Sequence, residues 1–114
     1  PLPHPRLTRP QSLAFRMLQT GSFPSRGRFS HFSPSIAPQC PDCGEAYCSL
    51  AHMLWQCPAL RDTEFINEKD WEEALKNSDL SVQLRAVQRA CERAEGHGLP
   101  VTTWERPATA TDSP

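Results

Sequence analysis

The sequence predicts a small, mainly α-helical protein with irregular, proline-rich ends. Two stretches after residue 66 place apolar side chains at helical spacing behind residues that cap helices well. Most of the twelve prolines lie outside these stretches, in residues 1–41 and 100–114. Four of the five cysteines crowd into residues 40–57, a segment with few apolar residues to bury. In a packed region this small, a bound metal commonly adds the stability that a limited core lacks.

Residues 1–39 are expected to form one helix followed by a loop. Residues 8–11 match a capping box, and a proline in the first turn is tolerated. The helix should run to about Gln19, and Gly21 suits its carboxyl end. Residues 22–39 are rich in Ser, Pro, Arg and Phe and show neither a helical nor a strand period. Because prolines are concentrated at both ends, we expect these ends to contribute little to the core.

Two helices are expected in residues 61–98. The first should begin after Asn67, with Ile66 and Trp71 forming a hydrophobic staple across this N-cap. Ser78 or Asp79 should cap the second helix, and glycines from residue 96 onward should stop it. One stripe of the second helix is apolar: Leu80, Leu84, Val87, Cys91 and Ala94. The polar residues between them should mostly face elsewhere: Gln83, Arg85, Gln88, Arg89 and Glu92.

The packed region is expected to run from about Cys40 to Trp104. Its two carboxyl-terminal helices should pack on each other through five apolar residues: Trp71, Leu75, Leu80, Leu84 and Val87. The three tryptophans, at positions 55, 71 and 104, are expected to be core or lid aromatics. Residues 99–114 are expected to form a disordered tail.

Residues 40–60 contain the pattern Cys40-x2-Cys43-x8-His52-x4-Cys57. Zinc prefers four nitrogen or sulfur ligands at tetrahedral corners, and a Cys-x2-Cys turn brings two thiolates to one ion. Gly44 follows the second cysteine, where such a turn often needs a positive φ. We therefore interpret residues 40–60 as a knuckle that binds one Zn²⁺. With four protein ligands no coordination position stays open, which favours a structural over a catalytic metal.

His52 and Cys57 constrain the local backbone. Ser49 can cap a short helix that carries His52. On a continuous α-helix, residues five apart point about 140° away from each other. The helix must therefore end before Cys57, and Pro58 favours this because a residue that precedes proline is disfavoured in the helical region.

The cysteines allow other interpretations. A redox role for Cys40 and Cys43 lacks the surrounding βαβ pattern that would support it. Cys48 could replace a ligand, although we expect it to be a bystander. Cys91 lies on the apolar stripe of the last helix and is expected to be a small buried hydrophobe. An odd number of cysteines fits a secreted disulfide framework poorly and a metal cluster in a reducing, intracellular compartment well.

The charge of the chain is unevenly distributed. Residues 1–39 carry five arginines and no acid, whereas the remainder carries seven basic and thirteen acidic residues. Basic residues interleaved with aromatic ones are typical of segments that bind single-stranded nucleic acid. The candidate contact residues are Arg16, Arg26, Arg28, Phe29, His31 and Phe32. A solvated loop without a partner explains the same pattern equally well. No apolar run is long enough to suggest a membrane span.

Three stretches of this sequence resemble the carboxyl-terminal end of non-LTR retrotransposon polyproteins, and above all those called tick transposon proteins. They are LQTGSFP at residues 18–24, CPDCG at 40–44 and AHMLWQCP at 51–58. The stretches LRAVQRA at 84–90 and WERP at 104–107 are similar to that family as well. In these proteins a reverse transcriptase domain, often followed by ribonuclease H, precedes a Cys-Cys-His-Cys finger of this spacing.

The resemblance implies that the chain is a non-catalytic, zinc-binding fragment that assists binding of RNA or single-stranded DNA. The chain opens on Pro1 rather than Met, which suggests a fragment or a processed product. It has no aromatic-x-Asp-Asp polymerase signature, and its few acids before Cys57 cannot supply a ribonuclease H carboxylate cluster. Cytoplasm and nucleus are the expected locations. The main alternative is a purely structural zinc module that caps the preceding catalytic domain or contacts another protein.

Overall fold

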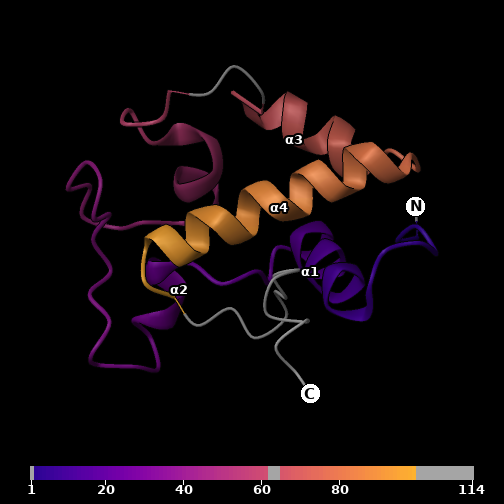
Figure 1. The fold of residues 1–114 in the computed structure, drawn as a ribbon. Helices are drawn as coiled ribbons and strands as arrows, with labels where there is room; N and C mark the ends of the chain where they lie inside the picture. The colour runs from indigo at the N-terminus through magenta and orange to yellow at the C-terminus, as the bar shows by residue number, and fades with distance from the viewer. Residues whose placement is uncertain (1, 62–64, 100–114) are drawn as a thin grey trace.

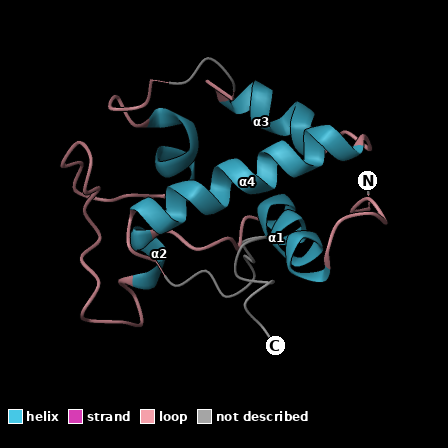
Figure 2. Cartoon of the chain, in the orientation of Figure 1, coloured by secondary structure: helices cyan, strands magenta, loops and turns pink. Residues whose placement is uncertain are grey.

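The computed structural model describes residues 2–61 and 65–99 of the chain (Figure 1). The regular structure of these residues is helical, and loops connect the helices (Figure 2). In chain order the elements are α1 (Arg9–Thr20), α2 (Arg26–Phe29), the π-helical turn η1 (His52–Gln56), α3 (Glu68–Leu75) and α4 (Leu80–Gly96). The prediction of a mainly α fold with a cysteine–histidine cluster is therefore confirmed.

Helix α4 is the central element of the fold. It is 17 residues long, and α1, α3 and η1 all pack against it. In Figure 1, α3 and η1 lie on one side of α4, and α1 and α2 lie on the other. The carboxylate of Asp79 caps its amino end by accepting hydrogen bonds from two backbone N–H groups. Among the described residues, no helix combines the length and the apolar character that a membrane crossing requires.

The amino-terminal segment takes part in the core, contrary to the expectation from its prolines. The capping box at Thr8 forms as predicted, and Gly21 ends α1 in the left-handed conformation. Phe15 and Leu18 of α1 are buried, as are Leu7 before the helix and Phe23 after it. Prolines at the ends shape the chain but do not prevent the residues between them from packing, which is why composition alone was misleading here.

Helix α3 packs on α4 largely through Trp71, which is buried. Asn67 caps α3 as predicted, with its side chain accepting a hydrogen bond from the backbone of Asp70. The predicted staple is wrong, because Ile66 is 56 % exposed. Phe65 takes its place, with its ring centroid 4.8 Å from that of Trp71. A positive φ of 56° at Phe65 turns its side chain inward, and sequence periodicity gives no sign of such a turn.

The buried stripe of α4 differs in part from the predicted one. Val87, Cys91 and Ala94 are buried as expected, whereas Leu80 and Leu84 are half-buried at its edge. Gln83 was expected to face away from the core but is fully buried. Its side-chain oxygen accepts a hydrogen bond from the backbone of His4, and its amide donates to the carbonyl of Asn77. The buried amide is therefore satisfied, and it attaches the amino-terminal segment to α4.

Two further expectations need correction. Residues 22–39 are not entirely irregular, because Ser25 caps the four-residue helix α2. Gly27 of α2 lies so close to the segment before η1 that an added Cβ would meet the carbonyl oxygen of Cys48 at 2.8 Å. The predicted tail cannot begin at Leu99, since Leu99 is buried. The rest of the predicted tail, including Trp104, lies outside the described residues.

Candidate metal centre

The Cys-x2-Cys turn forms a compact knuckle. The backbone N–H of Gly44 donates to the carbonyl of Cys40 at 2.9 Å, and the N–H of Cys40 donates to the carbonyl of Glu45, also at 2.9 Å. Gly44 has a φ of 83°, as the sequence predicts, and a residue with a Cβ would be strained there. The turn closes on itself, which directs the side chains of Cys40 and Cys43 toward the same point.

A π-helical turn brings His52 and Cys57 together. The hydroxyl of Ser49 accepts a hydrogen bond from the N–H of His52 at 3.1 Å, so this residue caps the turn as predicted. The N–H of Cys57 donates to the carbonyl of His52 at 3.0 Å, an i to i+5 bond. Cys57 itself is extended, with φ −65° and ψ 124°, so the helical geometry ends before it as expected. The wider turn removes the divergence that an α-helix would impose.

All four predicted ligand residues converge. Their ligand atoms lie within 4.8 Å of one another. The sulfur atoms of Cys40 and Cys57 are 3.8 Å apart, and the sulfur of Cys43 is 3.2 Å from Nε2 of His52. Cys43 is the most accessible of the four, and the others are buried. The four cysteines of residues 40–57 are free thiols, as is Cys91. This group could therefore hold a metal ion.

The surroundings of Cys40 and Cys57 shift the pKa values of these two thiols in opposite directions. Burial raises the pKa of Cys40, but backbone N–H groups of Asp42 and Cys43 and the ring of His52 more than offset it, which lowers the pKa to about 7. Burial raises the pKa of Cys57 to about 11, although a backbone hydrogen bond from Ala59 opposes this. A metal ion binds thiolates, and of these two thiols Cys40 is the one that ionises more readily near neutral pH.

Cys48 and Cys91 lie outside the group of four. Cys48 is fully buried, and burial raises its pKa to about 12. Its sulfur lies 3.9 Å from Nδ1 of His97. Cys91 is fully buried in α4, where burial raises its pKa to about 12. Both residues thus behave as small buried hydrophobes.

A polar clamp, formed by Asp42, Arg93 and His97, attaches the knuckle to the carboxyl end of α4. Asp42 lies between Cys40 and Cys43, and one of its oxygens is 3.0 Å from Arg93 Nη2 and 3.1 Å from His97 Nε2. Burial raises the pKa of Asp42, but the hydrogen bonds from His97 and Arg93 outweigh it and lower the pKa overall. Burial lowers the pKa of His97, whose side chain is fully buried. The clamp therefore connects the loop between Cys40 and Cys43 to α4.

The same helix end also contacts the other half of the centre. Nε of Arg93 donates to the carbonyl of Met53 at 3.0 Å, inside η1. The sequence did not predict the contacts of His97 and Arg93. His97 lies just after the helix, and Arg93 resembles a solvated helix residue. The only available signal was a histidine between Gly96 and Gly98, where a helix ends and its last carbonyls need donors.

The predicted nucleic-acid residues are only partly available. Arg16, Arg28, His31 and Phe32 are exposed. Phe29 is half-buried, and its ring centroid is 5.2 Å from that of Phe32.

Arg26 was expected to contact nucleic acid, but its guanidinium is used within the fold. Its guanidinium donates to the carbonyls of Ala37 at 3.0 Å and of His97 at 2.7 Å. Arg26 therefore braces the loop against the end of α4. Tyr47, which the sequence analysis did not select, places its hydroxyl 3.2 Å from Nε2 of His31.

Comparisons of the chain with known protein families, with curated proteins and with solved structures gave no match. Its function must therefore be inferred from the geometry of its own residues.

Proposed function

We propose that Cys40, Cys43, His52 and Cys57 bind one Zn²⁺ that stabilises the fold. The observation that supports this most strongly is the spacing of their ligand atoms. Four atoms at about 2.0–2.3 Å from one zinc ion, at tetrahedral corners, lie about 3.3–3.8 Å from each other. The 3.8 Å between the sulfur atoms of Cys40 and Cys57 lies at the upper end of this range, and the 3.2 Å between the sulfur of Cys43 and Nε2 of His52 lies just below it. Three thiolates and one imidazole are also the softer ligands that zinc accepts.

The zinc ion has a structural role. Four protein ligands fill a tetrahedral shell, so no position is open for a water or a substrate. The ion joins the knuckle to η1, whose Met53 and Leu54 are buried in the core. Since the clamp residues Asp42 and Arg93 connect these segments to α4, the ion also determines how firmly α4 is attached at its carboxyl end. The chain is therefore a zinc-stabilised module without catalytic activity of its own.

Metal analysis of the purified chain tests this proposal. We expect one equivalent of zinc, and Co²⁺ in its place should show the absorption bands of a tetrahedral site with thiolate ligands. Cys43→Ser should lose most of the metal. Cys48→Ala is the matched control, because this cysteine lies between the same segments but outside the group of four. Absence of stoichiometric zinc, or equal metal content in the two variants, would contradict the proposal.

A second candidate function is the binding of single-stranded nucleic acid. It is favoured by α2 and the loop that follows it, where Arg28, His31 and Phe32 are exposed and His31 contacts Tyr47. Cationic side chains attract phosphates, and aromatic faces stack on bases whatever their sequence. The three thiolates give the zinc centre a formal charge of −1, so the loop rather than the centre would attract phosphate. The resemblance to retrotransposon proteins stays a prediction. The same holds for a role of this chain beside reverse transcriptase and ribonuclease H domains.

Salt-dependent binding of an oligonucleotide tests this second function. Arg16→Gln with Arg28→Gln should reduce the salt slope by about 1.4, near 0.7 for each lost phosphate contact. Arg26 is left intact because it braces the fold. Arg61→Gln with Lys69→Gln, two exposed cations elsewhere, is the matched control. If the intact chain does not bind at about 50 mM salt, or both pairs behave alike, the structural-module reading is favoured.

A further inference from the structure

A groove separate from the metal centre lies between the carboxyl end of α1, the segment around the start of η1, and α3. Its volume is about 500 Å³, within the range of pockets that hold ligands or peptide side chains. Apolar side chains form most of its lining: Leu18, Leu50, Leu54, Trp55, Trp71 and Leu75. Leu50, Trp55 and Leu75 are half-buried, so their remaining exposed surface is available to a partner.

The charged side chains that line this groove are acidic. Glu68 and Glu72 of α3 lie along one wall, both exposed, and none of the described lysines and arginines lines the groove. The last turn of α1, which forms another wall, contains no basic residue. A helix carries partial negative charge at its carboxyl end, so this wall also favours a cation. An apolar floor beside two carboxylates is complementary to an apolar segment that carries positive charge.

A second observation points to an occupant. The indole N–H of Trp71, which belongs to the groove lining, is buried and has no hydrogen-bond partner among the described residues. Such a group costs free energy unless an acceptor is supplied. A side-chain oxygen of a bound segment, entering beside Trp71, would supply one.

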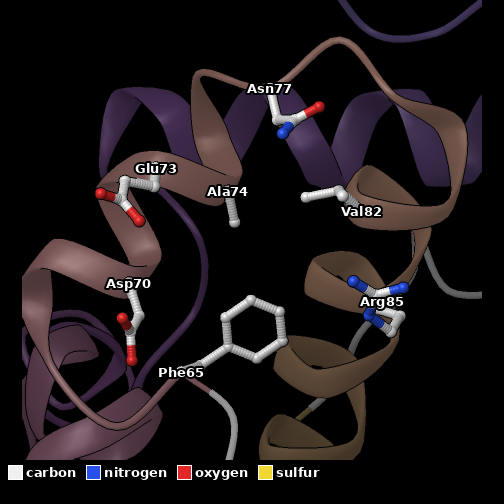
Figure 3. Close-up of a pocket in the computed structure, with 7 residues that line it drawn as sticks. All are labelled: Phe65, Asp70, Glu73, Ala74, Asn77, Val82 and Arg85. Carbon is white, nitrogen blue, oxygen red and sulfur yellow. The ribbon is translucent and has the colours of Figure 1, made fainter.

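The hollow between α3 and α4 differs from the groove, because its lining carries charges of both signs. Asp70 and Glu73 lie on one side of the Phe65 ring, and Arg85 lies on the other (Figure 3). Charges of both signs compensate one another there, so this hollow selects neither a cation nor an anion. Glu73 is nevertheless useful, because it lies on the same helix as Glu68 and Glu72 but does not line the groove.

We propose that the acidic groove, defined by Leu50, Trp55, Glu68, Trp71 and Glu72, binds an amphipathic helix of a partner protein. Apolar residues of that helix, at positions i, i+3 or i+4, and i+7, enter the groove. Lysine or arginine residues beside them face the two carboxylates. This interaction is separate from the zinc centre, none of whose four ligand residues lines the groove.

The experiment uses the zinc-loaded full chain with Trp104→Phe, so that Trp55 and Trp71 report on the groove. The probe is a synthetic peptide of about 14 residues with leucines at helical spacing and flanking lysines. A second peptide carries glutamine in place of each lysine. We expect the lysine peptide to change the tryptophan emission and to bind about ten-fold more tightly than the glutamine peptide.

Variants of α3 locate the interaction. Glu68→Gln with Glu72→Gln should weaken binding of the lysine peptide about five- to ten-fold and leave the glutamine peptide unaffected. Glu73→Gln with Glu92→Gln removes the same amount of exposed charge outside the groove and should change little. Ala51→Lys, at the groove lining, should abolish binding of the lysine peptide. Zinc content and circular dichroism verify that each variant is folded.

The outcomes separate this proposal from its competitors. Equal affinity for the two peptides, equal effects of the two glutamate pairs, or no binding would overturn it. Self-association that competes with the peptide would assign the groove to a second copy of this chain, and displacement by an oligonucleotide would assign it to nucleic acid. Peptide binding that persists in a chain without metal would leave this proposal intact while contradicting the role of zinc in the fold.

Discussion

The two ends of α4 are attached to the rest of the molecule by different forces. Near its start, apolar side chains of α1 and α3 pack against it, with Phe15 and Trp71 buried. Near its end, Cys91 and Ala94 are buried as well, and in addition Arg93 and His97 hold the knuckle through hydrogen bonds and an ion pair with Asp42. Apolar burial is tolerant of geometry, whereas the carboxyl end of α4 depends in addition on a few precise polar contacts and on the proposed zinc ion. The difference predicts which perturbations act locally and which act on the whole fold.

Removal of zinc should have the largest effect, and it should be strongest at the polar end. Structural zinc supplies on the order of 10 kcal/mol in small fingers, because the ligand segments have little other stabilisation. Hydrogen exchange after chelation should show loss of protection in residues 40–57 and in the last turn of α4. Amides of α1 and of the first turns of α4 should keep more protection. Uniform loss along the chain would show that the two ends do not differ in this way.

The next largest effect on stability is expected from a substitution in α1, which packs near the start of α4. Phe15→Ala should destabilise the fold by about 3–5 kcal/mol, because the ring is fully buried between α1 and the core. Leu13→Ala, on the same helix, is the control, since Leu13 is 49 % exposed and should cost much less. Thermal or urea denaturation measures both. Similar effects for the two would mean that α1 is not part of the core, as the proline content had suggested.

The fold class and the convergence of the four candidate ligand residues were predictable because both leave local signals. The caps Thr8 and Asn67 were identified from side-chain chemistry that acts within three residues, and Asp79 was one of two candidates with Ser78. The convergence of His52 and Cys57 followed from ligand spacing, although the π-turn that achieves it did not.

Contacts between distant segments were not predictable in the same way. Phe65 replaced Ile66 at the cap of α3 because a positive φ turned it inward. Gln83 was expected at the surface, yet its amide bonds to the backbone of His4, 79 residues away. Arg26 was assigned to nucleic acid, but its guanidinium donates to the carbonyl of His97. In each case a polar or aromatic side chain has several permitted environments, and tertiary structure selects one.

Substitutions in the clamp should have a smaller effect, and this effect should be on zinc affinity. Arg93→Gln and His97→Gln should each lower zinc affinity about 10- to 100-fold, the range found for groups that position metal ligands. Arg85→Gln, near the other end of α4, is the control. Competition with a chelator of known affinity measures each variant, and combination with Asp42→Asn should give non-additive losses because the groups share one carboxylate. Additive losses would mean that the clamp does not act through Asp42.

The smallest effect is expected at the start of α4, where the pH dependence of the Asp79 cap can be isolated. Hydrogen bonds from the Ser81 hydroxyl and then from the Val82 backbone N–H lower the pKa of Asp79 below its ordinary value of 3.8. A lowered pKa means that the ionised cap stabilises the folded state above pH 3.8, and that this contribution is lost as the pH falls through the folded-state value.

Asp79→Asn keeps an oxygen that can accept the capping bonds but has no titration of its own. The melting temperature of this variant should therefore vary less with pH in the acid range than that of the parent chain, with little difference at neutral pH. Glu92→Gln removes an exposed carboxylate from the same helix and provides the charge control. If the parent and Asp79→Asn lose stability equally as the pH falls, the acid sensitivity lies at the polar end of α4 and not at its cap.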